Sequence, residues 1–497
     1  MVSLTLRGRS LRLAVTLSCA SGYLLFGYDQ GVLGGLVNQP TFLDRLGNPS
    51  SGLIGSTMAI FYPACVVGSI ISGLVGQKLG RRKMIFLGTI VMTIGIILQT
   101  VMQTFVQFIV GRIITGIGNG LITATIPIYV AEVATDSARG RVVCIQMSIV
   151  IFGLFTAYWI DYGTIRHLSG DAVWRLPIAL QLVFSVACCS TIMLLPESPR
   201  WLFSRGRKNE SATVLAQLFD CDADDNQVLY KIQELEQTMR LEQEKLSLHE
   251  LFHSKSELKL FRRIAIVFII PMLGQFTGVN VLTFYLPVVL EDILGFSSNL
   301  SSLTSGFIQL AYWVGTLPPI WTVERFGRRA TLLLGSAVLA FSMILFTISL
   351  NINTPGGNNL SLAMLVLFQF GMGMSWSCIP WIIAPEITPL NLRHIGGALG
   401  PGSQWLWTTV IVFMAPPAIE NTGWKIYILF DIGIVAGLVF VYFFLPETKD
   451  KTLEEIDYVF ASNATQSALA ARAPQEAIMI NTLHGKSDVE LQQVERV

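Results

Sequence analysis

The sequence predicts an all-α membrane protein with twelve transmembrane helices in two six-helix halves. Three observations lead to this prediction: the composition is too apolar for a water-soluble fold, the apolar residues gather in long runs, and short motifs of the first half recur in the second. Of 497 residues, 52% are hydrophobic and 13% are charged. A soluble domain carries about 25% charged residues, so an ordinary soluble protein is excluded.

The apolar runs are long enough to cross a bilayer, which takes about 20 residues each. The first run has no cleavage site, so it is interpreted as a span and not as a signal peptide. We expect one helix in each of twelve runs: 11–36, 52–76, 84–103, 106–131, 141–162, 173–195, 262–290, 302–323, 330–350, 360–384, 396–417 and 424–445.

The distribution of basic residues predicts that both termini are cytosolic. With the N-terminus inside, 29 of the 34 Lys and Arg residues fall on the cytosolic side, as the positive-inside rule requires. Of the other five, Arg112 is the one assigned to a span, and Arg45, Arg166, Arg175 and Lys425 lie at the outer side.

We expect four parts along the chain: an N-terminal bundle at 1–200, a cytosolic helical linker at 201–260, a C-terminal bundle at 261–457 and a disordered cytosolic tail at 458–497. Within the linker, Lys231–Leu246 places Ile232, Leu235 and Met239 on one helical face among charged residues, which is typical of an amphipathic helix. The tail is polar and rich in small residues.

Three motif pairs recur at nearly one offset. Gly80-Arg81-Arg82 returns as Gly327-Arg328-Arg329, Glu132 and Arg139 return as Glu386 and Arg393, and Pro196-Glu197 returns as Pro446-Glu447. Such a duplication predicts two halves that lie side by side around a site near the midplane and rock against each other. This arrangement is typical of a carrier.

Two opposite charges are expected within the membrane. Asp29 lies about seven residues from the outer end of the first run, and Arg112 lies about six residues into the fourth. At 1.5 Å per residue both lie about 10 Å deep. Because an unpaired ion there is costly, we expect an Asp29–Arg112 pair that can carry a proton. A purely structural ion pair is the alternative.

Neutral polar and aromatic side chains populate the remaining spans. Amides both donate and accept hydrogen bonds to hydroxyls, and an indole covers the apolar face of a sugar ring. Glycines and Pro380 also interrupt runs seven and ten close to Gln275, Asn280 and Trp381, which predicts that freed backbone lines a cavity there. For any one Gln or Trp, helix–helix contact is the alternative.

The chain resembles the sugar porter family of the major facilitator superfamily, particularly its fungal hexose-transporter-like members, over about residues 10–456. The resemblance rests on FGYDQGVLGG (Phe26–Gly35), the two GRR motifs, GRIITGIGNG and PIYVAEVATDSARGR (Pro127–Arg141), and further on PESPRW (Pro196–Trp201), PWIIAPEITPLNLR (Pro380–Arg393) and PETKDKTLEE (Pro446–Glu455). It implies the major facilitator fold.

The resemblance also implies roles for individual residues. Proton coupling falls to Asp29 and Arg112. Sugar contacts fall to Phe26, Gln146, Gln275, Asn280, Tyr285, Trp381, Gln404 and Trp405. The charges that close the cytosolic side are Arg82, Glu132, Arg139, Glu197, Arg329, Glu386, Arg393 and Glu447.

Five positions depart from the family pattern. Gly274 replaces the first glutamine of a Gln-Gln pair, and Tyr312 and Thr408 stand where asparagine is common. Gln77 replaces an aspartate in the first GRR motif, and Asp450 replaces a glycine. The first three alter amide contacts around the solute and so bear on specificity.

We therefore expect a transporter of a monosaccharide or similar neutral polyhydroxylated solute, working by alternating access as a proton symporter. It is expected to be a monomer in the plasma membrane, with no cofactor, metal, nucleic-acid partner or enzymatic activity, and with Asn299 as a glycosylation site. The alternatives are an equilibrative facilitator, a carrier of a non-sugar metabolite, and a nutrient receptor on a transporter fold.

Overall fold

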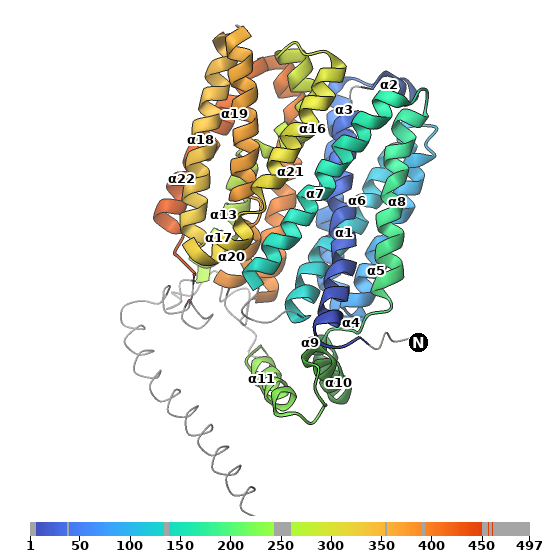
Figure 1. Ribbon diagram of the computed structural model, residues 1–497, viewed down its shortest axis with the longest axis vertical. Coiled ribbons are helices and arrows are strands. Elements are labelled where there is room, and N and C mark those ends of the chain that lie inside the picture. Colours follow the sequence, from blue (N-terminus) through green and yellow to red (C-terminus); the bar gives the residue numbers. More distant parts are fainter. Residues whose placement is uncertain are drawn as a thin grey trace, which may run out of the picture.

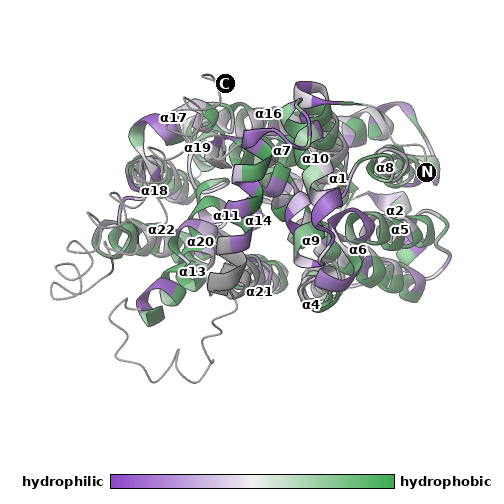
Figure 2. Cartoon of the chain, turned by 90° about the horizontal axis from the view of Figure 1, so that it is seen from below, coloured by the Kyte–Doolittle hydropathy of each residue, from purple (hydrophilic) through white to green (hydrophobic). Residues whose placement is uncertain are grey.

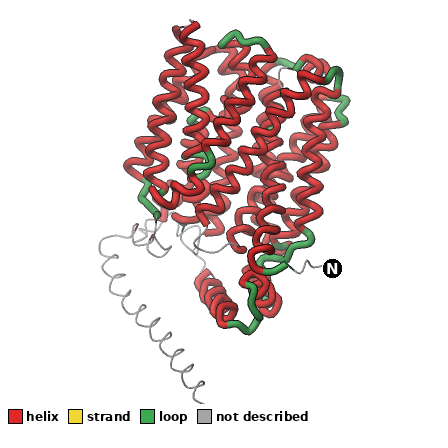
Figure 3. Tube along the Cα trace, in the orientation of Figure 1, coloured by secondary structure: helices red, strands yellow, loops and turns green. Residues whose placement is uncertain are grey.

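The computed structural model describes residues 6–36, 39–133, 139–242, 260–352, 355–388 and 393–449, together with Ile456 and Phe460. Every regular element within these residues is a helix (Figure 3). The expected tail at 458–497 lies outside the described residues, apart from Phe460.

The N-terminal bundle is formed by the helices α1–α8. Its short helices, α2 and α3, lie at the end of the bundle away from the N-terminus (Figure 1). The bounds are α1 (Gly8–Leu36), α2 (Pro40–Leu46), α3 (Ser51–Ala59), α4 (Phe61–Leu79), α5 (Arg81–Thr100), α6 (Phe105–Val133), α7 (Arg139–His167) and α8 (Ala172–Ile192).

The C-terminal bundle contains more interrupted helices. Its bounds are α13 (Leu260–Gln275), α14 (Val279–Phe284), α15 (Leu286–Val288), a π-helical turn (Val289–Ile293), α16 (Ser298–Gly315), α17 (Pro319–Phe326), α18 (Arg328–Ile352), α19 (Pro355–Met374), α20 (Ile379–Ile387), α21 (Arg393–Thr422), a 3₁₀ turn (Gly423–Lys425) and α22 (Ile426–Phe444).

These helices account for all twelve expected runs. In the described residues, nine stretches are long and apolar enough to cross a membrane, and the last of them, Leu399–Phe444, contains both α21 and α22. The other two runs are broken into shorter helices, because α13 stops at Gln275 and α16 stops at Gly315. The run 302–323 is divided between α16 and α17, because Pro318 and Pro319 follow the end of α16 and lead into α17.

Small residues bring the helices of the N-terminal bundle together. A side chain at Gly120 would place its Cβ 2.2 Å from the carbonyl oxygen of Cys65, and one at Gly118 would come 2.5 Å from the backbone nitrogen of Met92. Helix α6 therefore packs directly on α4 and α5 through the GRIITGIGNG motif, because glycine lets two backbones approach closely.

Helices α9 (Pro199–Ser204), α10 (Lys208–Phe219) and α11 (Asn226–Glu242) form the linker and lie beneath the bundles, at the end where the N-terminus is found (Figure 1). We call this the linker end and the opposite one the far end. Arg12 of α1 donates a hydrogen bond to the carbonyl of Leu218, 2.7 Å away. Ile232 and Leu235 of α11 pack on a small core with Val228, and the side chain of Met239 lies outside the described residues.

The two bundles contact each other at several depths. Within the described residues, Thr316 donates a hydrogen bond to Ser148 at 2.9 Å, and the rings of Phe155 and Trp313 stack at 5.9 Å, so α7 packs along α16. Seen from the linker end, the helices are largely hydrophobic, whereas hydrophilic residues mark α11 and α17 (Figure 2). The bilayer-facing character predicted from composition is thus evident around the bundles.

Candidate functional site

Two interrupted helices of the C-terminal bundle frame the site. Helix α13 ends at Gln275 and α14 begins at Val279, and Gly278 between them adopts φ +83°. A side chain there would also collide with the ring of Phe430, 2.6 Å from its Cβ. Helix α19 likewise ends at Met374, before α20 begins at Ile379. The loops lie within the group of helices, as the sequence predicts (Figure 3).

An amide cluster joins the first of these breaks to α21. The amide oxygen of Gln275 accepts hydrogen bonds from Asn280 and from the hydroxyl of Thr408, the latter at 3.1 Å. Gln275 is 2% exposed and Thr408 is equally buried. Thr408 stands where the family pattern has asparagine, and it supplies a hydroxyl in place of the amide.

Aromatic rings from both bundles meet beside this cluster. The ring of Trp405, on α21, makes an edge contact with Phe26 of α1 at 5.6 Å and stacks on Tyr62 of α4 at 6.1 Å. Tyr62 in turn contacts Phe284 of α14 at 6.0 Å. Sequence reasoning missed Tyr62, because a tyrosine inside an apolar run carries no signal of its own.

Several buried polar atoms in this region have no hydrogen-bond partner in the described structure. They are the amide nitrogen of Gln146, the hydroxyl of Tyr285 and the indole nitrogen of Trp405. All three residues are at most 4% exposed. Buried polar atoms are normally satisfied, so unpaired donors such as these are suited to a polar ligand.

Two further predicted contact residues, Trp381 and Gln404, are only partly buried. Trp381, on α20, is partly exposed and packs against the main hydrophobic core. Gln404, on α21, is also partly exposed. Among the described residues, neither side chain hydrogen-bonds to the amide cluster. The backbone carbonyl of Gln404 lies 2.8 Å from the Thr408 hydroxyl and shares its single proton with Gln275.

The expected charge pair is present. Arg112 of α6 lies 3.1 Å from the carboxylate of Asp29 on α1, and their side chains are 4% and 0% exposed. The guanidinium also lies over the ring of Phe61, 4.4 Å from its centroid. Phe61 precedes Tyr62, whose hydroxyl donates to Gln30 at 3.2 Å. The charge pair and the aromatic contact with Trp405 are therefore three residues apart on α1, at Asp29 and Phe26, and involve adjacent residues on α4, Phe61 and Tyr62.

Gly274 makes room for a tryptophan. Trp376, in the loop between α19 and α20, has ring atoms 3.4 Å from where a Cβ at Gly274 would lie, and its indole donates to Ser336 at 2.9 Å. Tyr312, the second departure, accepts a hydrogen bond from Ser377 at 2.9 Å. Both departures therefore reshape the region around the second helix break.

The charged residues at the linker end form two similar clusters, and in each the first arginine of the GRR motif makes the ion pair. Arg81, and not Arg82, pairs with Glu132 at 3.0 Å. In the C-terminal bundle Arg328, and not Arg329, pairs with Glu386 at 2.8 Å. The side chains of Arg139 and Arg393 lie outside the described residues.

Arg82 and Arg329 instead donate hydrogen bonds to backbone carbonyl groups. Arg82 donates to the carbonyl of Leu195 at 2.8 Å, and Arg329 donates to that of Tyr442 at 2.6 Å. The two remaining carboxylates, Glu197 and Glu447, cap the N-termini of α5 and α18, which begin at Arg81 and Arg328. Glu197 accepts from the backbone N–H of Arg81 at 2.9 Å, and burial raises its pKa above the usual value while these backbone donors oppose the rise.

Glu447 takes the equivalent position in the C-terminal bundle, where it accepts from the backbone N–H groups of Arg328 and Arg329 at 2.9 and 3.0 Å. The two bundles also touch here: a side chain at Gly140, at the start of α7, would come 2.6 Å from Glu324 and 3.1 Å from Arg328. The charged cluster of the C-terminal bundle thus lies at a contact with α7 of the N-terminal bundle.

One buried carboxylate was missed. Asp161 of α7 is 1% exposed, and neither of its oxygens has a hydrogen-bond partner among the described residues. It lies at the end of the expected run 141–162, where an acidic residue predicts that the helix ends and a loop begins. The helix continues to His167 and carries Asp161 into the packed interior.

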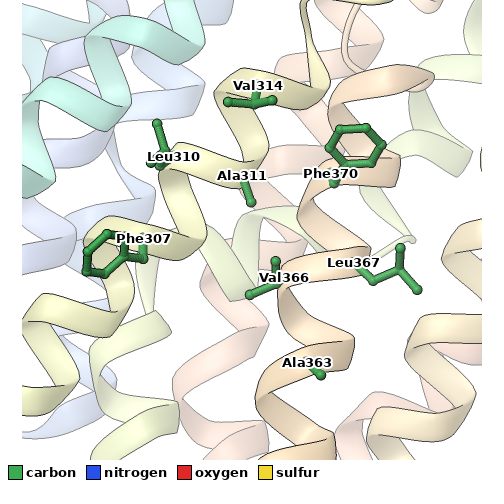
Figure 4. Close-up of a pocket in the computed structure, with 8 residues that line it drawn as sticks. All are labelled: Phe307, Leu310, Ala311, Val314, Ala363, Val366, Leu367 and Phe370. Atoms are coloured by element: carbon green, nitrogen blue, oxygen red, sulfur yellow. The ribbon is translucent and has the colours of Figure 1, made fainter.

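A separate apolar groove of about 420 Å³ lies between α16 and α19, away from the polar side chains described above. Figure 4 shows it, and its lining is entirely apolar: Phe307, Leu310, Ala311, Val314, Ala363, Val366, Leu367 and Phe370. It offers no hydrogen-bonding side chain to a polar solute.

Comparisons with known proteins agree with this architecture. The family model described as "Sugar (and other) transporter" matches residues 15–460. The MFS-type transporter oryC of Aspergillus oryzae is 35% identical over 487 residues, covering 95% of this chain and 90% of that protein. Sugar transporter STL1 of Saccharomyces cerevisiae is 31% identical over 471 residues, covering 92% and 82%.

Among solved structures, the proton:xylose symporter XylE bound to 6-bromo-6-deoxy-D-glucose matches with a TM-score of 0.77 at 24% identity, covering 91% of this chain and 99% of that one. This likeness shows the fold, which is that of the major facilitator superfamily. The predicted fold class, twelve transmembrane helices in an all-α membrane protein, is confirmed.

Proposed function

The chain belongs to the sugar (and other) transporter family and is a multi-pass membrane protein, and from this premise we propose that it carries a monosaccharide or similar neutral polyol across the plasma membrane by alternating access, in symport with a proton. We further propose that it works as a monomer with both termini in the cytosol. No cofactor takes part in this mechanism.

The observation that carries the substrate class is the set of buried polar atoms that have no hydrogen-bond partner among the described residues. Gln146 and Tyr285 present buried groups without partners, and Trp405 adds both an indole N–H and an aromatic face. The hydroxyls of a sugar ring can hydrogen-bond to the unpaired polar groups, and its apolar C–H face can pack on the tryptophan ring. An anionic solute would need a cationic partner, and Arg112, the arginine beside this region in the described residues, is already paired with Asp29.

The amide cluster supplies the specificity. Gln275, Asn280 and Thr408 satisfy one another in this structure. A sugar hydroxyl can replace any of these contacts at little net cost, because it both donates and accepts. Phe26, Trp381 and Gln404 complete the proposed binding surface from α1, α20 and α21.

Alternating access requires contacts that break at one end while others form at the opposite end. At the linker end, the proposed cytosolic gate consists of the Arg81–Glu132 and Arg328–Glu386 pairs with the capping carboxylates Glu197 and Glu447. Arg82, Arg139, Arg329 and Arg393 remain proposed members of this gate. A network of this kind can bias two conformations although single exposed pairs are weak.

Proton coupling is proposed to use the Asp29–Arg112 pair. While the carboxylate and guanidinium touch, as here, the ionised form of Asp29 is stabilised. If α1 and α6 separate during the transport cycle, the buried carboxylate loses its counter-ion and takes up a proton instead. The proton is then held in one conformation and released in the other.

Uptake of a labelled panel of sugars and polyols tests the function in a yeast strain that lacks its own transporters, with and without a protonophore. We expect saturable uptake of at least one panel member, with accumulation that the protonophore abolishes. Equilibrative uptake would identify a facilitator. No uptake of any panel member, with normal delivery to the plasma membrane, would overturn the proposed substrate class.

The Gly274→Gln variant tests the specificity argument separately. Glutamine there would meet the ring of Trp376, 3.4 Å from the Cβ position, so we expect a changed preference among the panel members. An unchanged preference would show that Gly274 and Trp376 do not shape the binding surface. Uptake of a non-sugar metabolite by the unmodified chain, with none of the sugars, would favour the metabolite carrier.

A further inference from the structure

Asp161 lies at the junction of three helices at the far end. A side chain at Gly35 of α1 would place its Cβ 2.2 Å from a carboxylate oxygen of Asp161, so the carboxyl group rests against the α1 backbone. One turn earlier on α7, the hydroxyl of Tyr158 donates to the carbonyl of Thr283 on α14, and it lies against Gly34. The two bundles are therefore joined immediately beside Asp161.

Asp161 differs from Asp29, the buried acidic residue of α1. Asp29 has Arg112 as a partner, whereas both oxygens of Asp161 are buried without a hydrogen bond in the described structure. Among the described residues no cation contacts Asp161: α14 carries no titratable side chain, Arg175 of α8 is paired with Asp171, and Arg166, later on α7, donates to the hydroxyl of Tyr162. The titratable side chains of the helices around this part of α7 nearest in sequence to the junction are Tyr28 and Asp29 on α1, Tyr158 and Tyr162 on α7, Arg175 on α8 and Tyr312 on α16.

An ionised carboxylate in this position would be very unfavourable, because the side chain is shielded from bulk solvent and no counter-ion or hydrogen-bond donor among the described residues reaches it. The neutral acid loses much less by burial. The closed arrangement of α1, α7 and α14 is therefore compatible with Asp161 only in its protonated form.

We propose that Asp161 is a second proton-binding carboxyl group, which is protonated while the far end is closed and ionises when α1 and α14 move apart and admit water. The inference rests on the proposed alternating access, since it requires that the far end opens. It does not depend on the identity of the solute or on Asp29. Rising pH then favours opening of the far end, and each opening releases a proton.

A cysteine at Thr283 reports on this opening. Thr283 is 4% exposed, its backbone carbonyl and not its side chain binds Tyr158, and a thiol is similar in size. We would measure the rate at which a membrane-impermeant maleimide modifies Thr283→Cys in proteoliposomes between pH 5 and 9, reading the modified peptide by mass spectrometry. The matched control is Ser297→Cys, an exposed residue before α16, which corrects for the pH dependence of thiol reactivity.

The corrected rate at Thr283→Cys should rise with pH, up to about tenfold per pH unit for one released proton. In the Asp161→Asn background it should no longer depend on pH, and in the Asp29→Asn background the dependence should persist. A pH dependence that survives in Asp161→Asn would overturn the inference, as would its loss in Asp29→Asn alone. Modification at no pH would overturn it as well, because the far end would then not open.

Asp161→Ser is the second variant, in case the asparagine variant does not fold, and it should behave in the same way. The outcome is separable from the proposed function. A chain that transports no sugar can still show the Asp161-dependent modification, and a sugar transporter can lack it.

Discussion

The rings of Tyr62 and Trp405 stack across the boundary between the two bundles, with centroids 6.1 Å apart and planes at 22°. The hydroxyl of Tyr62 also donates to Gln30, the residue after Asp29. One side chain of α4 therefore touches both the proposed binding surface and the segment of α1 that carries the proposed proton site. A substitution that moves Tyr62 at one of these contacts can therefore alter the geometry of the other.

Tyr62→Phe separates these two contacts, because it keeps the ring and removes the hydroxyl. We expect a KM for the sugar close to that of the unmodified chain but a weaker dependence of uptake on external pH. Tyr62→Ala should in addition raise KM by about two- to tenfold, since an aromatic pair contributes about 0.5–1.5 kcal/mol. Initial uptake rates at several pH values measure both effects. Identical pH profiles for Tyr62→Phe and the unmodified chain would show that the hydroxyl has no part in coupling.

Gln275→Ala should raise KM by about two- to tenfold with little change in Vmax, since one hydrogen bond contributes about 0.5–1.5 kcal/mol.

Thr408 offers a matched pair of variants: Thr408→Ser keeps the hydroxyl that bonds Gln275 at 3.1 Å, and Thr408→Val removes it. We expect transport kinetics to change in the valine variant only. Equal KM values for Thr408→Ser and Thr408→Val would contradict a role of this hydroxyl.

The linker-end clusters predict which arginine is energetically coupled to Glu132. Arg81 pairs with it at 3.0 Å, whereas Arg82 donates to a backbone carbonyl. In double-mutant cycles of thermal stability, Arg81→Gln with Glu132→Gln should therefore show a coupling energy of about 0.5–3 kcal/mol. The Arg82→Gln cycle with Glu132→Gln serves as the control and should be close to additive. A larger coupling energy in the Arg82 cycle than in the Arg81 cycle would show that Arg82 makes the ion pair with Glu132.

Two exposed sequons at opposite ends test the orientation. Asn299 lies in the first turn of α16 at the far end, and Asn209 lies in α10 of the linker. If both termini are cytosolic, N-glycosylation can occur at Asn299 and not at Asn209. We expect Asn299→Gln, but not Asn209→Gln, to remove a glycan-dependent shift in electrophoretic mobility. A glycan on Asn209 would reverse the orientation.

Much of the fold could be predicted from the sequence, because length and hydrophobicity decide whether a segment spans a bilayer. The Asp29–Arg112 pair could be predicted for the same reason: two opposite charges at one depth in an apolar medium have few alternatives. The breaks near Gln275 and Trp381 were marked by glycine and proline, which are the residues that interrupt a helix.

Other features depend on the direction of side chains in the packed structure, which cannot be inferred from sequence patterns alone. Arg81 and Arg82 are neighbours on a helix and point about 100° apart, and only the packed structure shows that Arg81 reaches Glu132. Trp376 fills the space beside Gly274 from a loop 102 positions away. Asp161 was missed because the helix that carries it is longer than its apolar run.

Transport against a gradient tests the proposed symport most directly, and Asp29→Asn is the variant that decides it, because asparagine mimics a permanently protonated carboxyl group beside Arg112. In proteoliposomes with an imposed pH gradient, the unmodified chain should accumulate its labelled sugar above the external concentration, and a protonophore should abolish this. The Asn variant should lose accumulation and pH dependence but keep downhill exchange. If the unmodified chain only equilibrates the sugar and Asp29→Asn behaves identically, the chain is a facilitator and the symport is contradicted.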